Sequence, residues 1–328
     1  MPTLAIAEAE ELVAATLVRC RTSDGNAISV AHALVAAEAD GLKGHGLSRL
    51  PSYAAQSKIG KVDGFAEPKV SQPRRGVAMV DAAHGFAYPA LSLAEVVLPE
   101  MARTAGIACA GITRSHHCGV TGHPAERLAG AGLVAMLFAN TPGAIAPWGG
   151  TSATFGTDPI AFACPLPGAA PIVVDLSLSK VARGNILAAR QKGERIPEGW
   201  ALDVAGNPTT DPQAALAGTM LPLGDAKGTA LALMVELLAA GLTGANYAAD
   251  ASSFLDAEGP PPGTGQLIIA IDPEAFPGGP SHFARLAAAI EAQPGARLPG
   301  ARRLARRAEA HRDGLEVSEA LLHEIEAV

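Results

Sequence analysis

Six short apolar runs separated by helical stretches set the strongest limit on how this chain can fold. The runs are rich in Val, Ile, Leu and Ala, which is typical of buried strands. They span 76–82, 107–113, 133–139, 159–164, 171–176 and 266–272, and helical stretches are expected at about 89–103, 123–131 and 226–242. The middle of the chain is therefore predicted to be a mixed α/β unit.

The alternation of strands and helices would ordinarily favour parallel pairing around a dinucleotide, but the loops typical of that fold are missing. No strand is followed by Gly-x-Gly-x-x-Gly, and the chain contains no Gly-x-x-x-x-Gly-Lys-Ser/Thr. If a nucleotide binds, it binds without those loops. The order of the strands stays open.

The first seventy residues are predicted to be mostly helical. Apolar side chains fall on one helical face over residues 5–20 and 26–39, and a shorter helix is expected from Tyr53 to Ile59. A glycine-bounded loop at 60–64 follows. We expect a helical part over 1–72, joined by 285–328, and an α/β part over 73–284 that binds cofactor and substrate.

The net charge and the composition limit which classes of molecule this protein can bind. The net charge of −7 argues against a nucleic-acid or anionic membrane surface, and 48% hydrophobic residues support a well-buried globule. No apolar run reaches the roughly 18 residues of a spanning helix. Early acidic residues (Glu8, Glu10, Glu11) contradict a signal peptide, so we expect a cytoplasmic protein. The four cysteines are scattered and are interpreted as reduced.

The stretch Gly41–Arg49 presents one histidine, His45, and one arginine, Arg49, on a turn with three glycines. Glycines let the backbone approach a ligand closely, and an imidazole with a guanidinium suits proton transfer and carboxylate binding. The alternative is an ordinary Gly-rich connection between two helices.

A second polar cluster, Ser115-His116-His117-Cys118-Gly119, follows a predicted strand and precedes a helix. The spacing of these histidines and His123 matches no zinc pattern, so we expect no metal. Hydrogen bonding toward a ligand is favoured, with a satisfied local histidine as the alternative.

Two other charged positions have two interpretations each, and a group of arginines follows near residue 300. Asp175 ends an apolar strand and is either a helix cap or an active-site carboxylate. Lys227 stands at a helix start, where it suits a phosphate or carboxylate but could equally be a solvated surface lysine. Arginines concentrate at 302–307 (Arg302, Arg303, Arg306, Arg307) in an otherwise acidic protein, and a solvated helix face is their plain interpretation.

Seven short motifs in order resemble the malate/L-lactate dehydrogenase-like oxidoreductases, a family unrelated to the Rossmann-fold lactate dehydrogenases. The motifs are Gly-His-Gly-x-x-Arg at 44–49, Ser-His-His at 115–117, Pro-Trp-Gly-Gly at 147–150, Gly-Thr-Asp-Pro-Ile-Ala at 156–161, Asp-Leu-Ser at 175–177, Ile-Pro-Glu-Gly-Trp-Ala-Leu-Asp at 196–203 and Pro-Leu-Gly-x-x-Lys-Gly at 222–228. Within the family, the chain is most similar to the reductases of cyclic imino acids, by the motifs 115–117, 155–162 and 234–244. The resemblance implies a mostly antiparallel sheet flanked by helices, a homodimer formed through the helical terminal parts, and NADPH in preference to NADH.

The resemblance also assigns roles to individual residues. It implies that His45 is the proton donor, that Arg49 and Thr157 contact the substrate, and that Asp175 orients the catalytic histidine. The implied cofactor contacts are His45, His117, Cys118, Gly119, Ser177, Lys227, Arg302 and Arg303. Two positions depart from the family pattern: Gly44 replaces a relay serine, and Asp158 replaces an asparagine.

The implied reaction is the NADPH-dependent reduction of Δ1-pyrroline-2-carboxylate or Δ1-piperideine-2-carboxylate to L-proline or L-pipecolate, steps of proline metabolism and lysine degradation. A dehydrogenase of an open-chain 2-hydroxy acid such as malate, lactate or ureidoglycolate is the alternative within the same fold. A non-catalytic binding protein derived from an enzyme is the alternative from another class.

Overall fold

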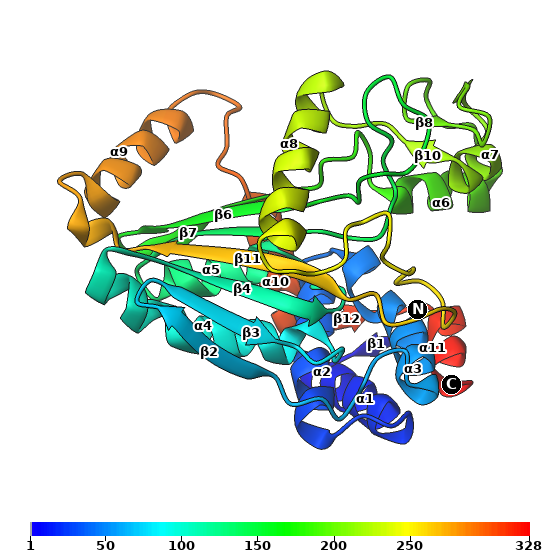
Figure 1. Ribbon diagram of the computed structural model, residues 1–328, viewed down its shortest axis with the longest axis horizontal. Helices are drawn as coiled ribbons and strands as arrows, with labels where there is room; N and C mark the ends of the chain where they lie inside the picture. The colour runs from blue at the N-terminus through cyan, green and yellow to red at the C-terminus, as the bar shows by residue number, and fades with distance from the viewer. Residues whose placement is uncertain (1) are drawn as a thin grey trace.

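A seven-stranded sheet forms the centre of the computed structural model, which describes residues 2–328 (Figure 1). Its strand order is β2-β3-β4-β11-β5-β6-β7. The strands are β2 (Lys69–Arg74), β3 (Val77–Asp81), β4 (Ile107–Ser115), β11 (Thr264–Ile271), β5 (Val134–Ala139), β6 (Ile160–Leu166) and β7 (Ala169–Leu176). Only β3 and β4 pair in parallel, so the predicted mixed, mostly antiparallel sheet is confirmed.

The late strand β11 explains why no parallel dinucleotide fold forms. It enters between β4 and β5 and pairs antiparallel with both of them. Most residues of β5 and β11 are buried, which fits the continuous apolar runs that such strands show when both faces are covered.

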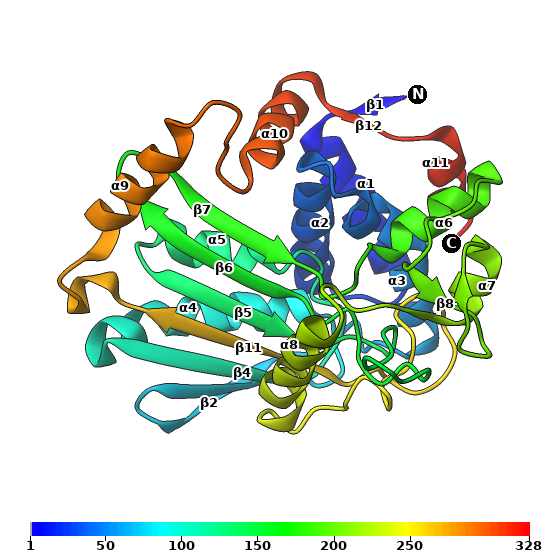
Figure 2. The ribbon, with the colours of Figure 1, turned by 90° about the horizontal axis from the view of Figure 1, so that it is seen from above.

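Helices cover both faces of this sheet (Figures 1 and 2). The helices α4 (Ala87–Ala105) and α5 (Gly122–Gly130) lie on one face, and α8 (Ala226–Glu236) lies on the other with the π-helical turn η3 (Leu237–Gly241). The helix α9 (Gly279–Glu291) follows the short 3-10 turn η4 (Pro273–Ala275) and packs on β6.

The N-terminal part is helical, as expected: α1 (Ile6–Arg19), α2 (Asp24–Ala39) and α3 (Leu50–Ile59). Ser23 caps α2 by accepting from the Asn26 N–H, and Gly60 ends α3 with a φ of 84°. The end of the chain returns to this part, since α10 (Ala301–Asp313) packs on α2 and α11 (Glu319–Glu326) packs on α3. Between them, β12 (Leu315–Glu316) pairs with β1 (Thr3–Leu4).

A small third unit was not expected from the sequence. It contains a three-stranded sheet in the order β10-β8-β9, made of Thr219–Met220, Ala201–Leu202 and Pro208–Thr209, with α6 (Arg183–Lys192) and α7 (Pro212–Ala217). Its strands are two residues long, too short for a periodic signal. It is held to α8 and the sheet by its own buried cluster, which includes Phe155, Leu178 and Ile186. Within residues 2–328, no helix combines the length and apolar character needed to cross a membrane.

Candidate active site

The buried carboxylate of Glu38 holds the turn that carries His45. After α2, two 3-10 turns follow, η1 (Lys43–His45) and η2 (Leu47–Arg49). Glu38 accepts the Leu47 N–H at 3.0 Å and lies 3.6 Å from Lys43 Nζ. A Cβ at position 46 would collide with Glu38 Oε2, so only glycine fits there. The histidine is therefore held on a backbone anchored to α2.

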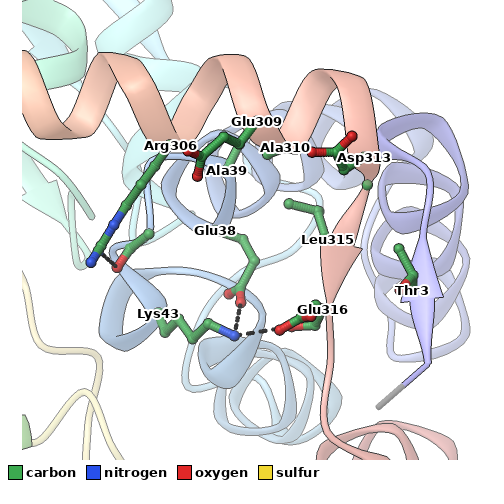
Figure 3. A pocket seen from close by; sticks show the side chains of 12 residues that line it. Thr3, Glu38, Ala39, Lys43, Arg306, Glu309, Ala310, Asp313, Leu315 and Glu316 are labelled. Carbon is green, nitrogen blue, oxygen red and sulfur yellow. Dashed lines mark hydrogen bonds and ion pairs between the residues drawn. The ribbon is translucent and has the colours of Figure 1, made fainter.

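A pocket of about 590 Å³ lies on the Glu38 side of this turn (Figure 3). Lys43 reaches across it to Glu38 and to the backbone oxygen of Glu316, at 3.0 Å. His45 does not line this pocket. The pocket therefore separates the turn from α10 and β12 and is distinct from the histidine cluster.

On its other side, His45 belongs to an aromatic cluster. Its ring stacks on that of His117, with centroids 5.3 Å apart and planes 20° apart. Tyr53 Oη lies 2.5 Å from His117 Nδ1 and 3.2 Å from Tyr88 Oη. Tyr53 is completely buried. His117, a predicted cofactor contact, is thus fixed in place by two tyrosines and brought next to His45.

The neighbouring His116 has a structural role. Its Nε2 lies 3.0 Å from Gln56 Oε1, and Gln56 Nε2 donates to the Phe254 carbonyl at 2.9 Å. The Phe254 ring packs against both His116 and His117, with centroids 5.0 and 5.1 Å away. Completely buried Lys61 holds the same loop by donating to the Ser253 carbonyl at 2.7 Å.

Burial and a nearby cation keep the site histidines neutral. Burial lowers the pKa of His45 to about 4, and the positive charge of Arg49 acts in the same direction. Burial likewise lowers the pKa of His116 to about 3 and that of His117 well below its usual value. At pH 7, His45 can therefore accept a proton, and it needs a bound anion to become a good proton donor.

Arg49 supplies a positive charge with free capacity for an anion. Its Nε donates to the Gly44 carbonyl at 2.6 Å, and no acidic side chain in residues 2–328 pairs with it. Arg49 ends the 3-10 turn that follows His45, and its charge lowers the pKa of His45 and of His117. A carboxylate bound by Arg49 would therefore lie near the His45–His117 stack.

The predicted substrate contact Thr157 lies beside a buried pair of carboxyls. Thr157 N–H donates to Thr141 Oγ1 at 2.8 Å. The next residue, Asp158, is fully buried at a φ of 41°, with neither carboxyl oxygen hydrogen-bonded to a donor. Burial and the neighbouring carboxyl of Glu236 raise its pKa well above the ordinary value, and burial also raises that of Glu236. Burial and their mutual repulsion therefore favour the protonated form of these carboxyls.

Asp175 does not make the expected contact with His45. Its Oδ1 accepts from Thr121 Oγ1 and its Oδ2 from the Gly122 N–H, both at 2.7 Å. These donors belong to the start of α5, so the carboxylate occupies that helix end. Asp175 is not itself the N-cap residue of a helix, since the next helix begins after Ala182, and its role toward His45 stays a prediction.

Arg303 is also engaged within the chain. It donates to Asp40 at 2.9 Å and to Glu126 at 2.7 Å, and its side chain is 14% exposed. Arg307 binds the same two carboxylates, and His123 Nε2 lies 2.8 Å from Asp40 Oδ2. The positive charge of Arg303 is therefore paired within an ion-pair network that joins α10, α2 and α5. Arg302 is exposed.

The remaining predicted cofactor contacts differ in exposure. Cys118 and Gly119 are buried, and Gly119 has a φ of 67° against Tyr88. Ser177 is exposed after β7, with its Oγ 2.7 Å from Ser179 Oγ. Lys227 is exposed on the first turn of α8. No cluster of three or more metal-ligating side chains occurs in the part of the chain that the structure describes.

Several residues of the cluster were missed in the sequence. The sequence did contain a hint that Tyr53 belongs to the site, because Tyr53 follows Arg49 by four residues, the same spacing that separates Arg49 from His45. Gln56 and Phe254 lie far apart in the chain, and no local sequence pattern indicates that either belongs to the site. Arg183, on the first turn of α6, is a further cation of this region whose pKa is lowered by burial and by Arg49.

Over nearly its whole length, the chain is similar to one known protein family. The model of the malate/L-lactate dehydrogenase family matches residues 4–326. A (2R)-3-sulfolactate dehydrogenase (NADP(+)) of Chromohalobacter salexigens is 50% identical over 99% of this chain and 97% of its own length. A Δ1-pyrroline-2-carboxylate/Δ1-piperideine-2-carboxylate reductase of Pseudomonas putida is 41% identical over 95% of this chain and 92% of its own.

Among solved structures, Δ1-piperideine-2-carboxylate reductase from Pseudomonas syringae superposes with a TM-score of 0.92 at 37% identity, covering 100% of this chain and 99% of that one. The family predicted from the motifs is thus confirmed, and the relatives include both a 2-hydroxy acid dehydrogenase and cyclic imine reductases. The chain belongs to the malate/L-lactate dehydrogenase family of NAD(P)-dependent oxidoreductases.

Proposed function

We propose that this enzyme interconverts a 2-hydroxy acid and its 2-oxo acid with NADP, and that 3-sulfolactate is its leading substrate. The observation that carries the proposal is Arg49, a cation with no acidic partner in residues 2–328, next to a neutral His45. The choice of sulfolactate is supported by the relative at 50% identity, which is more similar than the imine reductase at 41%.

The residues present fit an anionic dinucleotide. Lys227 is exposed on the first turn of α8, where its charge adds to the free N–H groups of the helix. No acidic side chain in residues 2–328 pairs with it. Ser177 offers a hydroxyl at the end of β7, and His117 is held beside His45. We propose that Lys227, Ser177 and His117 contact the cofactor, with NADPH preferred.

The proposed chemistry divides between cofactor and protein. The bound cofactor supplies or accepts the hydride at substrate C2. Arg49 holds the C1 carboxylate through parallel hydrogen bonds and so fixes the face of C2 that reacts. In oxidation, His45 takes the proton of the 2-hydroxyl as C2 loses its hydride and the carbonyl forms. In reduction, His45 gives a proton to the carbonyl oxygen.

A cyclic imino acid is the second candidate substrate. The fold match to Δ1-piperideine-2-carboxylate reductase and the motifs at 115–117 and 155–162 favour it. With such a substrate, Arg49 would again hold the carboxylate, and His45 would protonate the ring nitrogen as hydride reaches C2. The products would be L-proline or L-pipecolate.

The homodimer also stays a proposal. It is supported by apolar side chains exposed on the helical layer, such as Ile28 on α2 and Val96 on α4, which are 49% and 76% exposed. Light scattering during gel filtration measures the mass of the particle.

A substrate panel tests the proposed function. Purified protein is mixed with NADPH and, separately, with sulfopyruvate, oxaloacetate, pyruvate and the two cyclic imines, while absorbance of the reduced nicotinamide is followed. We expect the highest kcat/KM with sulfopyruvate. A higher kcat/KM with either imine would select the second candidate, and no oxidation with any compound would refute both.

A further inference from the structure

Tyr88, Tyr53 and His117 form a hydrogen-bonded chain that ends at the ring stacked on His45. Tyr53 Oη lies 2.5 Å from His117 Nδ1 and 3.2 Å from Tyr88 Oη. All three side chains are buried. They come from three separate parts of the fold, since Tyr53 belongs to α3, Tyr88 to α4 and His117 to the segment after β4. The geometry of the chain is therefore set by the packing of these elements.

All three groups are neutral at pH 7. Burial raises the pKa of Tyr53 to about 12 and the pKa of Tyr88 well above its ordinary value. Burial also lowers the pKa of His117 well below its ordinary value. Each tyrosine therefore has one O–H to donate, and His117 has one N–H, on either Nδ1 or Nε2.

Counting the donors selects one arrangement of these hydrogens. If His117 carried its hydrogen on Nδ1, it would donate to Tyr53, and Tyr53 would donate to Tyr88. The O–H of Tyr88 would then have no acceptor, because its only hydrogen bond within residues 2–328 is the one to Tyr53. In the opposite arrangement Tyr88 donates to Tyr53, Tyr53 donates to His117 Nδ1, and both O–H groups are paired. An unpaired buried donor is costly, so the second arrangement is favoured, and His117 carries its hydrogen on Nε2.

Nε2 is the only polar side-chain atom that His117 has left for a ligand. Its Nδ1 is bound to Tyr53, and its ring packs against Phe254 with centroids 5.1 Å apart. The ring also stacks on His45, so a group bound at Nε2 lies close to the atom on which His45 is proposed to act. In hydride transfer, substrate C2 meets C4 of a nicotinamide, and the carboxamide is attached to the neighbouring ring carbon. The oxygen of the cofactor nearest the reacting atoms is therefore the carboxamide oxygen.

We propose that Tyr53, held by Tyr88, is a positioning residue that fixes His117 as an Nε2–H donor for the carboxamide oxygen of the bound nicotinamide. This rests on the proposed cofactor contact of His117 and deepens it by naming the atom that binds and the residues that orient it. A neutral donor suits a neutral amide, whereas a phosphate is bound more strongly by a cation such as Lys227. The hydrogen stays on His117, so this residue transfers no proton.

The position of the hydrogen on His117 can be observed directly by NMR. Imidazole nitrogens are labelled with nitrogen-15, and spectra of the wild type are recorded at pH 7 without cofactor and with NADPH. His117→Gln identifies the signals of His117 by their loss. We expect a hydrogen on Nε2, an unprotonated Nδ1, and a shift of the Nε2 signal when NADPH binds. A hydrogen on Nδ1 would overturn the proposal.

The contact with the cofactor is tested by fluorescence titration with NADPH. A glutamine amide reaches about as far as Nε2, whereas an asparagine amide reaches only as far as Nδ1. We expect His117→Asn to raise Kd by about 3- to 10-fold, the loss of one hydrogen bond, and His117→Gln to raise it by less than about twofold. Titration with NADP⁺ and with its thionicotinamide analogue, in which sulfur replaces the carboxamide oxygen, identifies the acceptor. The wild type should prefer NADP⁺, and His117→Asn should bind both equally.

Tyr53→Phe separates positioning from general packing. It should raise the Kd of NADPH by about 3- to 10-fold in the wild type and by less than about twofold in His117→Gln, because the glutamine amide does not depend on Tyr53. The control is Tyr247→Phe, which removes the hydroxyl of a tyrosine that is 45% exposed and should leave Kd unchanged.

Three results of these titrations would overturn the proposal. They are equal losses of affinity in His117→Asn and His117→Gln, an equal effect of Tyr53→Phe in both backgrounds, and a preference for NADP⁺ that persists in His117→Asn. The spectra and the titrations need no turnover, so they decide the role of Tyr53 whatever the substrate panel shows. A failure of this proposal likewise leaves the proposed reaction intact.

Discussion

The pH dependence of turnover follows directly from the environment of His45. A pKa of about 4 instead of 6.5 means that burial and Arg49 disfavour the protonated ring by about 3 kcal/mol. At pH 7, about one molecule in a thousand of the free enzyme carries the proton. Oxidation needs neutral His45, so kcat/KM for the 2-hydroxy acid should stay level down to about pH 5 and be halved near pH 4.

The value of kcat/KM for reduction should depend on pH in the opposite direction. It needs protonated His45, so kcat/KM for the 2-oxo acid should fall as pH rises through the range 5–8. The kcat profile should be displaced to higher pH, because an anion held by Arg49 raises the pKa of His45 in the complex. The assay follows NADPH absorbance in both directions, with brief exposure to each pH. The control is His32→Asn, an exposed histidine on α2. A midpoint near 6.5 for oxidation would refute the reasoning from burial.

Three other predictions concern stability and cofactor choice. Tyr53→Phe leaves buried His117 Nδ1 without its partner, so thermal unfolding should show a loss of about 1–3 kcal/mol and kcat should fall. Because the pKa of Asp158 is raised, its contribution to the free energy of unfolding is complete below the ordinary pKa near 4 and is lost as pH rises above that value. Asp158→Asn should therefore become more stabilising as pH rises, which denaturant titrations at pH 5 and pH 9 measure. Arg303→Ala should lose about 1–3 kcal/mol because Asp40 and Glu126 lose a buried partner, while the ratio of NADPH to NADH affinity, from fluorescence titration, should not change. A loss of NADPH preference in that variant would instead place Arg303 at the cofactor.

Local patterns were enough to predict most elements of the main sheet. The runs at 107–113, 133–139 and 266–272 all became strands, because two covered faces require continuous apolar sequence. The insertion of β11 between β4 and β5 could not be predicted, since it depends on pairing between segments more than a hundred residues apart.

The candidate site was easiest to predict where its residues share one short segment. His45 and Arg49 share a turn whose glycines and charges are visible in the sequence. Asp175 and Arg303 show the limit, because the groups they contact, the start of α5 and two carboxylates, lie far from them in the sequence and could not be predicted.

The most direct test of the proposed chemistry is single-turnover hydride transfer in His45→Asn, with NADPH and the best substrate of the panel. We predict that NADPH binds within about twofold of the wild-type affinity, because the proposed phosphate contact, Lys227, is unchanged in this variant. The rate of NADPH oxidation should fall by about 10²- to 10⁴-fold, the usual contribution of a positioned acid or base. A rate equal to that of the wild type would show that the proton comes from another group and would contradict the assignment of His45.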